Sequence, residues 1–234
     1  MSLIKENIEV IKKEIETIYL ERNREPKDVT LIAVTKTVDI ERIKEAIDAG
    51  ITNIGENRVQ EIMDKYEDLK NYANFHLIGH LQSNKVKYII DKVKLIHSVD
   101  SMKLIDEIKK RAEKSNTIVN MLIQVNVARE DTKFGIDINE VDDYIEYASK
   151  FDNIKVQGLM TIAPYFEDAE KTRPIFRTLK EKFDELSNNK YNNVEMKYLS
   201  MGMTNDYKIA IEEGSNMVRI GTKIIGKRVY NSNL

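Results

Sequence analysis

Short apolar runs alternate with amphipathic stretches along most of this chain. Thr30 to Thr35 reads Thr-Leu-Ile-Ala-Val-Thr, and such a β-branched, apolar run predicts a strand that is buried on both faces. Residues 40–50 then space their apolar side chains along one helical face, with Asp39 as a candidate N-cap and Gly50 past the end. The same strand-then-helix order recurs to the end of the chain. It therefore predicts a parallel sheet covered by helices.

Eight strands and their helices follow from this pattern. The strands are predicted at residues 29–36, 53–57, 74–79, 95–98, 118–127, 155–161, 196–200 and 217–221. Helices are predicted at 3–24, 40–50, 59–69, from 83 onward as a basic helix, and at 102–114, 140–151, 173–186 and 206–213. Eight alternating units favour a closed (β/α)8 barrel of the TIM type, with an additional N-terminal helix, over an open doubly wound sheet. Only three prolines and short connections predict one barrel domain over residues 1–234.

Composition narrows the classes of function. The 234 residues are 41% hydrophobic and 32% charged, which is typical of a soluble globular protein. Thirty-seven basic and thirty-nine acidic residues give a net charge of −2, so no net field favours nucleic acid or an anionic membrane. The absence of cysteine excludes disulfides, thiolate metal sites and cysteine nucleophiles. Neither a signal peptide nor a membrane-length apolar run is recognisable, and we expect a cytoplasmic location.

The ends of the predicted strands carry the candidate chemistry, because a (β/α)8 barrel has its site at the carboxyl ends of its strands. The residues there are Lys36, Asn57, His80, Ser98, Asn126, Thr161, Ser200 and Arg219, followed by Gly221 and Thr222. This set contains no carboxylate pair for glycoside hydrolysis and no His/Asp/Glu cluster for a metal. It fits an anionic ligand that is held by one amine able to form a covalent bond.

Each of the two cationic side chains in this set, Lys36 and Arg219, has a purely structural explanation as well as a functional one. Lys36 ends a buried strand, and most lysines in such places merely extend their ammonium into water. Arg219 lies in an otherwise apolar strand and cannot lose its charge, so its burial requires a partner or an interior ligand. A structural salt bridge is the alternative for Arg219.

The loops after the seventh and eighth strands favour an anion site. Residues 200–203 read Ser-Met-Gly-Met, and residues 221–222 read Gly-Thr. Glycines allow a close approach of the backbone, hydroxyls donate hydrogen bonds, and these two loops commonly bind phosphate in such barrels. Each segment alone also fits an ordinary turn with a capping hydroxyl, but their joint occurrence favours the anion site.

Three other motifs do not predict a site. Residues 221–227 match the first part of a P-loop, but Arg228 stands where a magnesium-binding Ser or Thr is needed. His76 and His80 are four residues apart, yet their segment alternates like a strand, so we do not expect them to share a metal ion. His97, within an apolar strand, is expected to be a core histidine with its hydrogen bonds satisfied.

Six motifs occur together in a characteristic order. They are Ala33-Val34-Thr35-Lys36, Gly55-Glu56-Asn57, the run from His76 to Lys85, Gly158-Leu159-Met160-Thr161, Leu199-Ser200-Met201-Gly202-Met203, and Met217-Val218-Arg219-Ile220-Gly221-Thr222. Together they resemble the pyridoxal-phosphate homeostasis protein family, which is related to the barrel domain of alanine racemase. The resemblance covers about residues 28–228.

This resemblance implies a cofactor and its ligands. Lys36 would form the internal aldimine with pyridoxal 5′-phosphate (PLP), and Arg219 would face the pyridine nitrogen. An arginine there discourages protonation of the nitrogen and so weakens the cofactor as an electron sink. The other implied residues are Asn57 beside the ring, Ser200, Gly221 and Thr222 at the phosphate, and Met201 with Gly202 in the phosphate loop.

The same resemblance favours a carrier over an enzyme. The related racemases use a lysine and a tyrosine from a C-terminal β-domain of the partner subunit as their two bases. We expect no such domain after the eighth strand, and nothing in the sequence marks Tyr165 or Tyr207 as a second base. The prediction is thus a PLP-binding protein that buffers or delivers the cofactor, with no or negligible catalytic activity, no catalytic residue and no metal.

Partners and alternatives follow from that prediction. Apo forms of PLP-dependent enzymes are candidate recipients, and nucleic acid and membranes are not expected partners. We expect a monomer and leave a dimer open. Two enzymatic alternatives remain, namely a PLP-dependent amino-acid racemase and an aldolase-type barrel in which Lys36 attacks a sugar-phosphate carbonyl.

Overall fold

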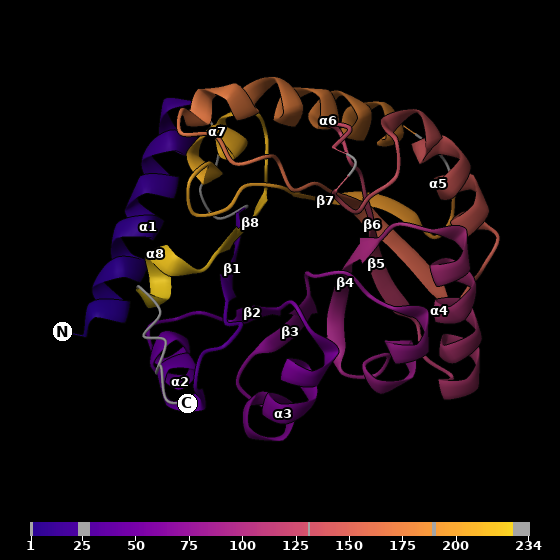
Figure 1. The fold of residues 1–234 in the computed structure, drawn as a ribbon, viewed down its shortest axis with the longest axis horizontal. Coiled ribbons are helices and arrows are strands. Elements are labelled where there is room, and N and C mark those ends of the chain that lie inside the picture. Colours follow the sequence, from indigo (N-terminus) through magenta and orange to yellow (C-terminus); the bar gives the residue numbers. More distant parts are fainter. Residues whose placement is uncertain (1, 23–28, 131, 189–190, 227–234) are drawn as a thin grey trace.

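Eight parallel strands close into a barrel in chain order, with β1 paired to β8 (Figure 1). The structure, a computed structural model, describes residues 2–22, 29–130, 132–188 and 191–226. The strands are β1 Thr30–Val34, β2 Asn53–Glu56, β3 Asn74–Leu77, β4 Val93–Val99, β5 Val119–Gln124, β6 Ile154–Met160, β7 Val194–Ser200 and β8 Met217–Ile220. The predicted (β/α)8 barrel is confirmed.

Helical segments follow the strands on the outside of the barrel. The α-helices are α2 Ile40–Asp48, α3 Val59–Leu69, α4 Met102–Ser115, α5 Val141–Ser149, α6 Arg173–Leu186, α7 Tyr207–Glu212 and α8 Thr222–Ile225. The 3₁₀ segments are η2 Ser83–Tyr88, η3 Ile138–Glu140 and η4 Ala169–Thr172. The predicted basic helix from residue 83 is thereby corrected to the short 3₁₀ segment η2. Val86 and Ile89, three residues apart, are both fully buried, a spacing that one 3₁₀ turn already provides.

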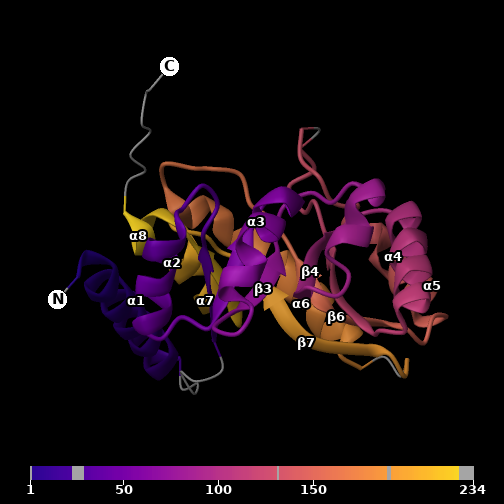
Figure 2. The same cartoon turned by 90° about the horizontal axis from the view of Figure 1, so that it is seen from below.

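The additional N-terminal helix is α1 Leu3–Glu21, capped by the Ser2 hydroxyl, which accepts a hydrogen bond from the Lys5 N–H. Its isoleucines are buried against α2, α7 and α8, on the side of the barrel away from α4 and α5 (Figures 1 and 2). The last two residues of the predicted helix, 23 and 24, lie outside the described residues. No helix in the described part of the chain is long and apolar enough to cross a membrane.

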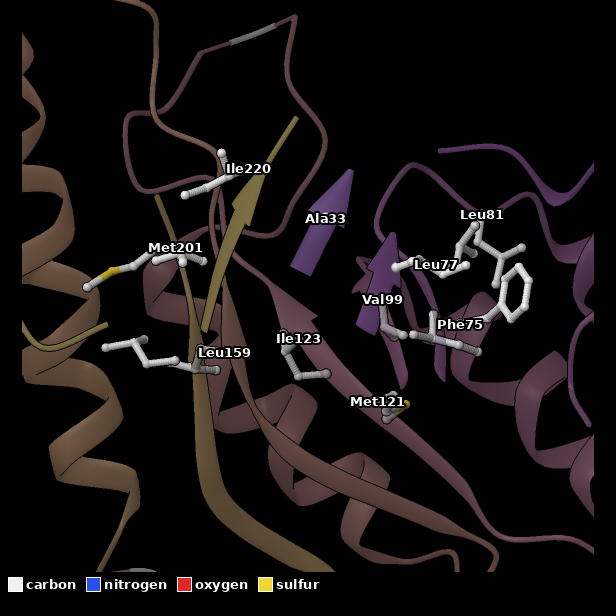
Figure 3. Close-up of a cluster of buried hydrophobic side chains, with 14 of the residues drawn as sticks. Ala33, Phe75, Leu77, Leu81, Val99, Met121, Ile123, Leu159, Met201 and Ile220 are labelled. Atoms are coloured by element: carbon white, nitrogen blue, oxygen red, sulfur yellow. The ribbon is translucent and has the colours of Figure 1, made fainter. Parts of the chain in front are cut away.

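The apolar core has two parts. The larger cluster fills the space between the strands and the helices, and Figure 3 shows part of it around Ile123, Leu159 and Met201. A smaller cluster lies inside the barrel and consists of Ile32, Leu95, Leu122, Met160 and Met217. Strands that are apolar on both faces therefore bury both faces, as predicted. The barrel interior also contains polar side chains that lead to the site.

Candidate functional site

A cavity of about 310 Å³ opens at the carboxyl ends of β1, β6, β7 and β8. Lys36, two residues after β1, lines it together with Arg219 from β8. Gly221 and Thr222, which directly follow β8, line it as well. Four of the eight residues predicted to bind a cofactor therefore share one cavity, at the end of the barrel where such folds bind their ligands.

Lys36 lies on a tightly held turn. The preceding residue, Thr35, is fully buried, and its N–H donates to the Gly55 carbonyl at 3.0 Å. The following residue, Thr37, has a φ of +59°, which is costly for a β-branched side chain. Its N–H donates to Oε1 of Glu61 at 2.8 Å. Lys36 itself is half-buried.

Arg219 is 2% exposed and is held by two neutral acceptors. Nη1 donates to Oγ of Ser200 at 2.5 Å, and Nη2 donates to the Thr161 carbonyl at 2.8 Å. Burial lowers the pKa of Arg219 to about 10, against the opposing effect of Asp206, so the guanidinium stays charged at neutral pH. Among the described residues, no carboxylate forms a salt bridge with it. The alternative of a structural salt bridge is therefore not what the structure contains.

The loops after β7 and β8 lie against each other at the cavity. The Arg219 N–H donates to the Gly202 carbonyl at 3.0 Å. Gly202 has a φ of +94°, and a Cβ there would lie 2.6 Å from Cβ of Ala210. A glycine is thus required for the loop to pass this close to α7. The next residue, Met203, donates its N–H to Oδ1 of Asp206 at 2.6 Å, which fixes the loop that borders the cavity.

Four predicted residues do not line the cavity. Ser200 is fully buried, and its hydroxyl contacts Arg219 and His97 inside the barrel. Met201 is also fully buried and packs in the larger apolar cluster (Figure 3). Gly202 acts through the loop conformation. Asn57 is half-buried, and its backbone packs against Gly79. A Cβ on Gly79 would lie only 2.4 Å from the Asn57 carbonyl oxygen.

Several lining residues were missed by the sequence reasoning. Thr204 and Asn205 continue the loop after β7 and add a hydroxyl and an amide. The signal for them was their direct continuation of the Ser-Met-Gly-Met motif. Lys133 comes from the long connection after β5, and no local pattern points to it. Asp206 is the one lining carboxylate among the described residues.

Tyr165 and Tyr207, the two tyrosines weighed as a second base, lie in different places. Tyr165 lines the cavity and is 75% exposed. Tyr207 is 2% exposed, and its hydroxyl is hydrogen-bonded to Glu14 and Lys223 on the outside of the barrel. Burial and these contacts with Glu14 raise the pKa of Tyr207. Tyr207 is therefore engaged away from the cavity.

The remaining polar strand ends are used within the fold. The Ser98 hydroxyl donates to the Gly79 carbonyl, the Asn126 amide to the Glu130 carbonyl, and the Thr161 hydroxyl to the Val125 carbonyl. His80 pairs with Asp100 and stacks on Phe134. These groups hold the connections around the barrel mouth.

The three histidines do not line the cavity of about 310 Å³. His76 points into the barrel and His80 contacts Asp100, so the two do not meet. No group of three His, Cys, Asp or Glu side chains in the described ranges is placed to hold a metal ion. His97 is fully buried with a partner at each ring nitrogen, as predicted. Residues 227 and 228 of the P-loop-like run lie outside the described residues.

Comparison with known proteins gives consistent matches. A family model described as the alanine racemase N-terminal domain matches residues 4–229. A pyridoxal phosphate homeostasis protein of Aquifex aeolicus is 49% identical over 201 residues, covering 86% of this chain and 87% of the relative. The PLP-bound structure of PipY from Synechococcus elongatus is 32% identical, with a TM-score of 0.78 and coverage of 91% of this chain and all of that one. An alanine racemase of Clostridium difficile, at 17% identity, a TM-score of 0.69 and coverage of 98% of this chain and 57% of that one, shares the fold alone.

Proposed function

The chain belongs to the family of pyridoxal phosphate homeostasis proteins, and we propose that it binds PLP in the cavity at the barrel mouth as a Schiff base on Lys36. In that bond Nζ of Lys36 joins the aldehyde carbon, and the aldehyde oxygen leaves as water. The proposed role is to buffer PLP in the cytoplasm, or to deliver it to apo forms of PLP-dependent enzymes. Catalysis is not part of it.

The observation that carries this proposal is the pairing of Lys36 with Arg219 on one cavity. The amine suits an aldehyde, and a buried guanidinium without a described carboxylate partner suits a ligand that accepts a hydrogen bond. Because Arg219 keeps its proton at neutral pH, it would donate to the pyridine nitrogen without protonating it. PLP supplies carbanion stabilisation in enzymes, and an unprotonated ring nitrogen weakens that capacity. The residues present therefore fit PLP that is held and not turned over.

For the phosphate, Gly221 and Thr222 are the proposed ligands, and Thr204 and Asn205 are added to them because they line the same cavity. Ser200 is assigned to the support of Arg219, since its hydroxyl lies inside the barrel. Met201 and Gly202 would shape the phosphate loop through packing and backbone conformation. Asn57 beside the ring stays a prediction from the resemblance.

The placement of possible second bases supports a carrier. Tyr165 is mostly exposed, and Tyr207 is engaged by Glu14. Asp206 already accepts the Met203 N–H, and Glu56 is fully buried in an ion pair with Lys65. Tyr207, Asp206 and Glu56 are thus each engaged by another group.

The test is the absorbance spectrum of purified protein loaded with PLP, before and after borohydride reduction. We expect a visible Schiff-base band, and reduction should fix PLP on the peptide that contains Lys36. Lys36→Ala should abolish both signals, whereas Lys133→Ala, which alters the other lysine of the cavity, should retain them. A band that persists in Lys36→Ala contradicts the assignment.

Two further measurements separate a carrier from an enzyme. The loaded protein should restore activity to an apo PLP-dependent enzyme in the presence of a trap for free PLP. Incubation with L-alanine or L-serine in deuterated water should exchange the α-proton no faster than free PLP does. Faster exchange would favour the racemase alternative. Borohydride trapping of a sugar phosphate but not of PLP would favour the aldolase alternative.

A further inference from the structure

Polar side chains form a continuous hydrogen-bond chain along the inside of the barrel. Nη1 of Arg219 lies 2.5 Å from Oγ of Ser200, which lies 3.0 Å from Nδ1 of His97. Nε2 of His97 lies 3.0 Å from Nδ1 of His76, and Nε2 of His76 lies 3.1 Å from Oδ1 of Asn53. We call this the Arg219–Asn53 chain. It joins β8, β7, β4, β3 and β2, which only barrel closure brings together.

The Arg219–Asn53 chain runs from one end of the barrel to the other. Arg219 lines the cavity at the carboxyl ends of the strands. Asn53 is the first residue of β2, at the opposite end, where a second cavity of about 170 Å³ is lined by Asn53, His76 and Lys94 among others. Between them, Ser200, His97 and His76 are at most 1% exposed. Such buried polar groups are costly unless every hydrogen bond among them is made.

The two ends of the Arg219–Asn53 chain determine which atom donates in each of its hydrogen bonds. A guanidinium only donates, so Oγ of Ser200 accepts from Arg219 and its one O–H is left to donate to Nδ1 of His97. The other end is an amide oxygen, which only accepts. Nδ2 of Asn74 donates to the Thr52 carbonyl at 3.2 Å and to Oδ1 of Asn53 at 3.3 Å. Because a backbone carbonyl only accepts, these two bonds orient both amides.

One arrangement of the histidine protons satisfies both ends. His97 must carry its proton on Nε2 and donate to Nδ1 of His76, and His76 must carry its proton on Nε2 and donate to Asn53. In the reverse order, the lone pair of Nε2 of His76 would face Oδ1 of Asn53, and the Ser200 O–H would lose its acceptor in the chain. A protonated imidazole has no acceptor nitrogen, so neither ring could then accept the hydrogen bond that its Nδ1 takes in this order.

The electrostatic setting agrees with two neutral imidazoles. Burial, with a smaller contribution from Lys94, lowers the pKa of His76 to about 3. Burial also lowers the pKa of His97 well below its ordinary value, and His76 and Arg219 add to this effect. At neutral pH both rings are thus uncharged and each has one donor and one acceptor nitrogen.

We propose that His97 and His76 are positioning residues for Arg219, which act through the Ser200 hydroxyl. The neutral chain turns the lone pairs of Ser200 toward Nη1, while the Thr161 carbonyl holds Nη2. Together these acceptors fix the plane of the guanidinium and the direction in which its remaining N–H groups meet a ligand. The part of this inference that concerns PLP rests on the proposed function, whereas the proton order does not.

The proton order is tested directly by ¹⁵N NMR of the imidazoles in the protein without PLP at pH 7. The protein has three histidines, so the signals that disappear in His76→Gln and in His97→Gln are assigned to His76 and His97. Both buried histidines should carry hydrogen on Nε2 and none on Nδ1. An Nδ1–H tautomer or a doubly protonated ring at either position overturns the proposal. This result stands whether or not the protein binds PLP.

The positioning role is tested by PLP titration of two variants at His97. His97→Phe removes the acceptor for Ser200 and should weaken PLP binding about tenfold to hundredfold, as expected for a hydrogen-bond network that ends on a charged group. It should also shift the Schiff-base band. His97→Asn retains an amide oxygen near the position of Nδ1. It should recover most of the PLP affinity and most of the native position of the Schiff-base band. His80→Phe, at a histidine outside the chain, is the matched control and should change neither.

The outcomes of this titration are distinct. Unchanged affinity and an unchanged band in His97→Phe, with near-native circular dichroism, would contradict the positioning role. Equal losses in His97→Phe and His97→Asn would also contradict it, since the acceptor would then not matter. If the unmodified protein failed to bind PLP, the proposed function would fail instead, and the NMR result would still decide the proton order.

Discussion

Nζ of Lys65 lies 2.8 Å from Oε1 of Glu56 and donates a second hydrogen bond of 2.8 Å to the Thr35 carbonyl. Lys65 comes from α3, Glu56 ends β2, and Thr35 directly precedes Lys36. Oε1 of Glu56 also accepts the Thr35 hydroxyl at 2.6 Å. This buried ion pair therefore holds the backbone that carries the proposed Schiff-base lysine.

Removal of the Lys65 charge should be strongly destabilising. Lys65→Met leaves the fully buried Glu56 carboxyl without its cation, and loss of one partner of a buried pair costs about 3–5 kcal/mol. The free energy of unfolding in urea measures this. Lys70→Met is the control, because Lys70 at the end of the same helix pairs with Glu67 on the surface. Equal effects of the two substitutions would show that the buried pair adds nothing.

Gly202 should tolerate alanine less well than Gly214 does. Both have positive φ, +94° and +102°, so alanine is strained at either position. A Cβ at Gly202 meets rigid atoms, Cβ of Ala210 at 2.6 Å and Cα of Tyr207 at 2.9 Å. At Gly214 it meets only the flexible Lys180 side chain. We expect Gly202→Ala to cost about 1–3 kcal/mol more in urea unfolding, and also to weaken PLP binding. Similar losses of stability in Gly202→Ala and Gly214→Ala would mean that the loop at Gly202 can shift to accommodate a Cβ.

Acid should weaken the fold through the buried histidines. The pKa of His76 is about 3 in the fold, against an ordinary 6.5. Between these values the unfolded chain binds a proton that the folded chain excludes, so stability falls as pH falls. The slope for His76 is about 1.4 kcal/mol per pH unit in that window and vanishes above it.

His76→Gln should therefore flatten the dependence of unfolding free energy on pH below 6.5. His97 contributes in the same direction and remains in this variant, so part of the slope should persist. The slope is the readout, since the substitution also changes stability by a pH-independent amount. An unaltered slope would contradict the burial of a neutral His76.

The docking of α1 depends on Glu14. Burial opposes its ionisation, but hydrogen bonds from Lys223, Tyr207 and Lys208 lower the pKa of Glu14 to about 2 from 4.5. The stability from these contacts is thus present above pH 4.5 and is lost as pH falls toward 2.

Glu14→Gln should destabilise the protein by about 1 kcal/mol at pH 7, a value reduced because the side chain is 26% exposed. The difference should shrink below pH 4.5, as measured by chemical unfolding at several pH values. Glu16→Gln, an exposed position on the same helix, should have little effect. A deficit of equal size at every pH would assign the effect to packing.

Much of the fold was predictable because its signals are local. An apolar run such as residues 30–35 is suited to burial on both faces in a parallel sheet. The Asp39 side chain caps its helix by accepting the N–H of Arg42, only three residues away. The error at residue 83 arose because the buried Val86 and Ile89 are three residues apart, a spacing that fits a 3₁₀ turn as well as an α-helix.

The sequence by itself determined the order of elements and, through the rule of strand ends, the presence of Lys36, Arg219, Gly221 and Thr222 at the barrel mouth. Only the tertiary structure decided that Ser200 turns inward to Arg219, that His76 meets His97, and that Lys133 reaches the cavity. The physical reason is that these contacts join strands and loops distant in the chain. Which side chains meet across a closed barrel depends on the register of every strand around it, and no local pattern of residues specifies that.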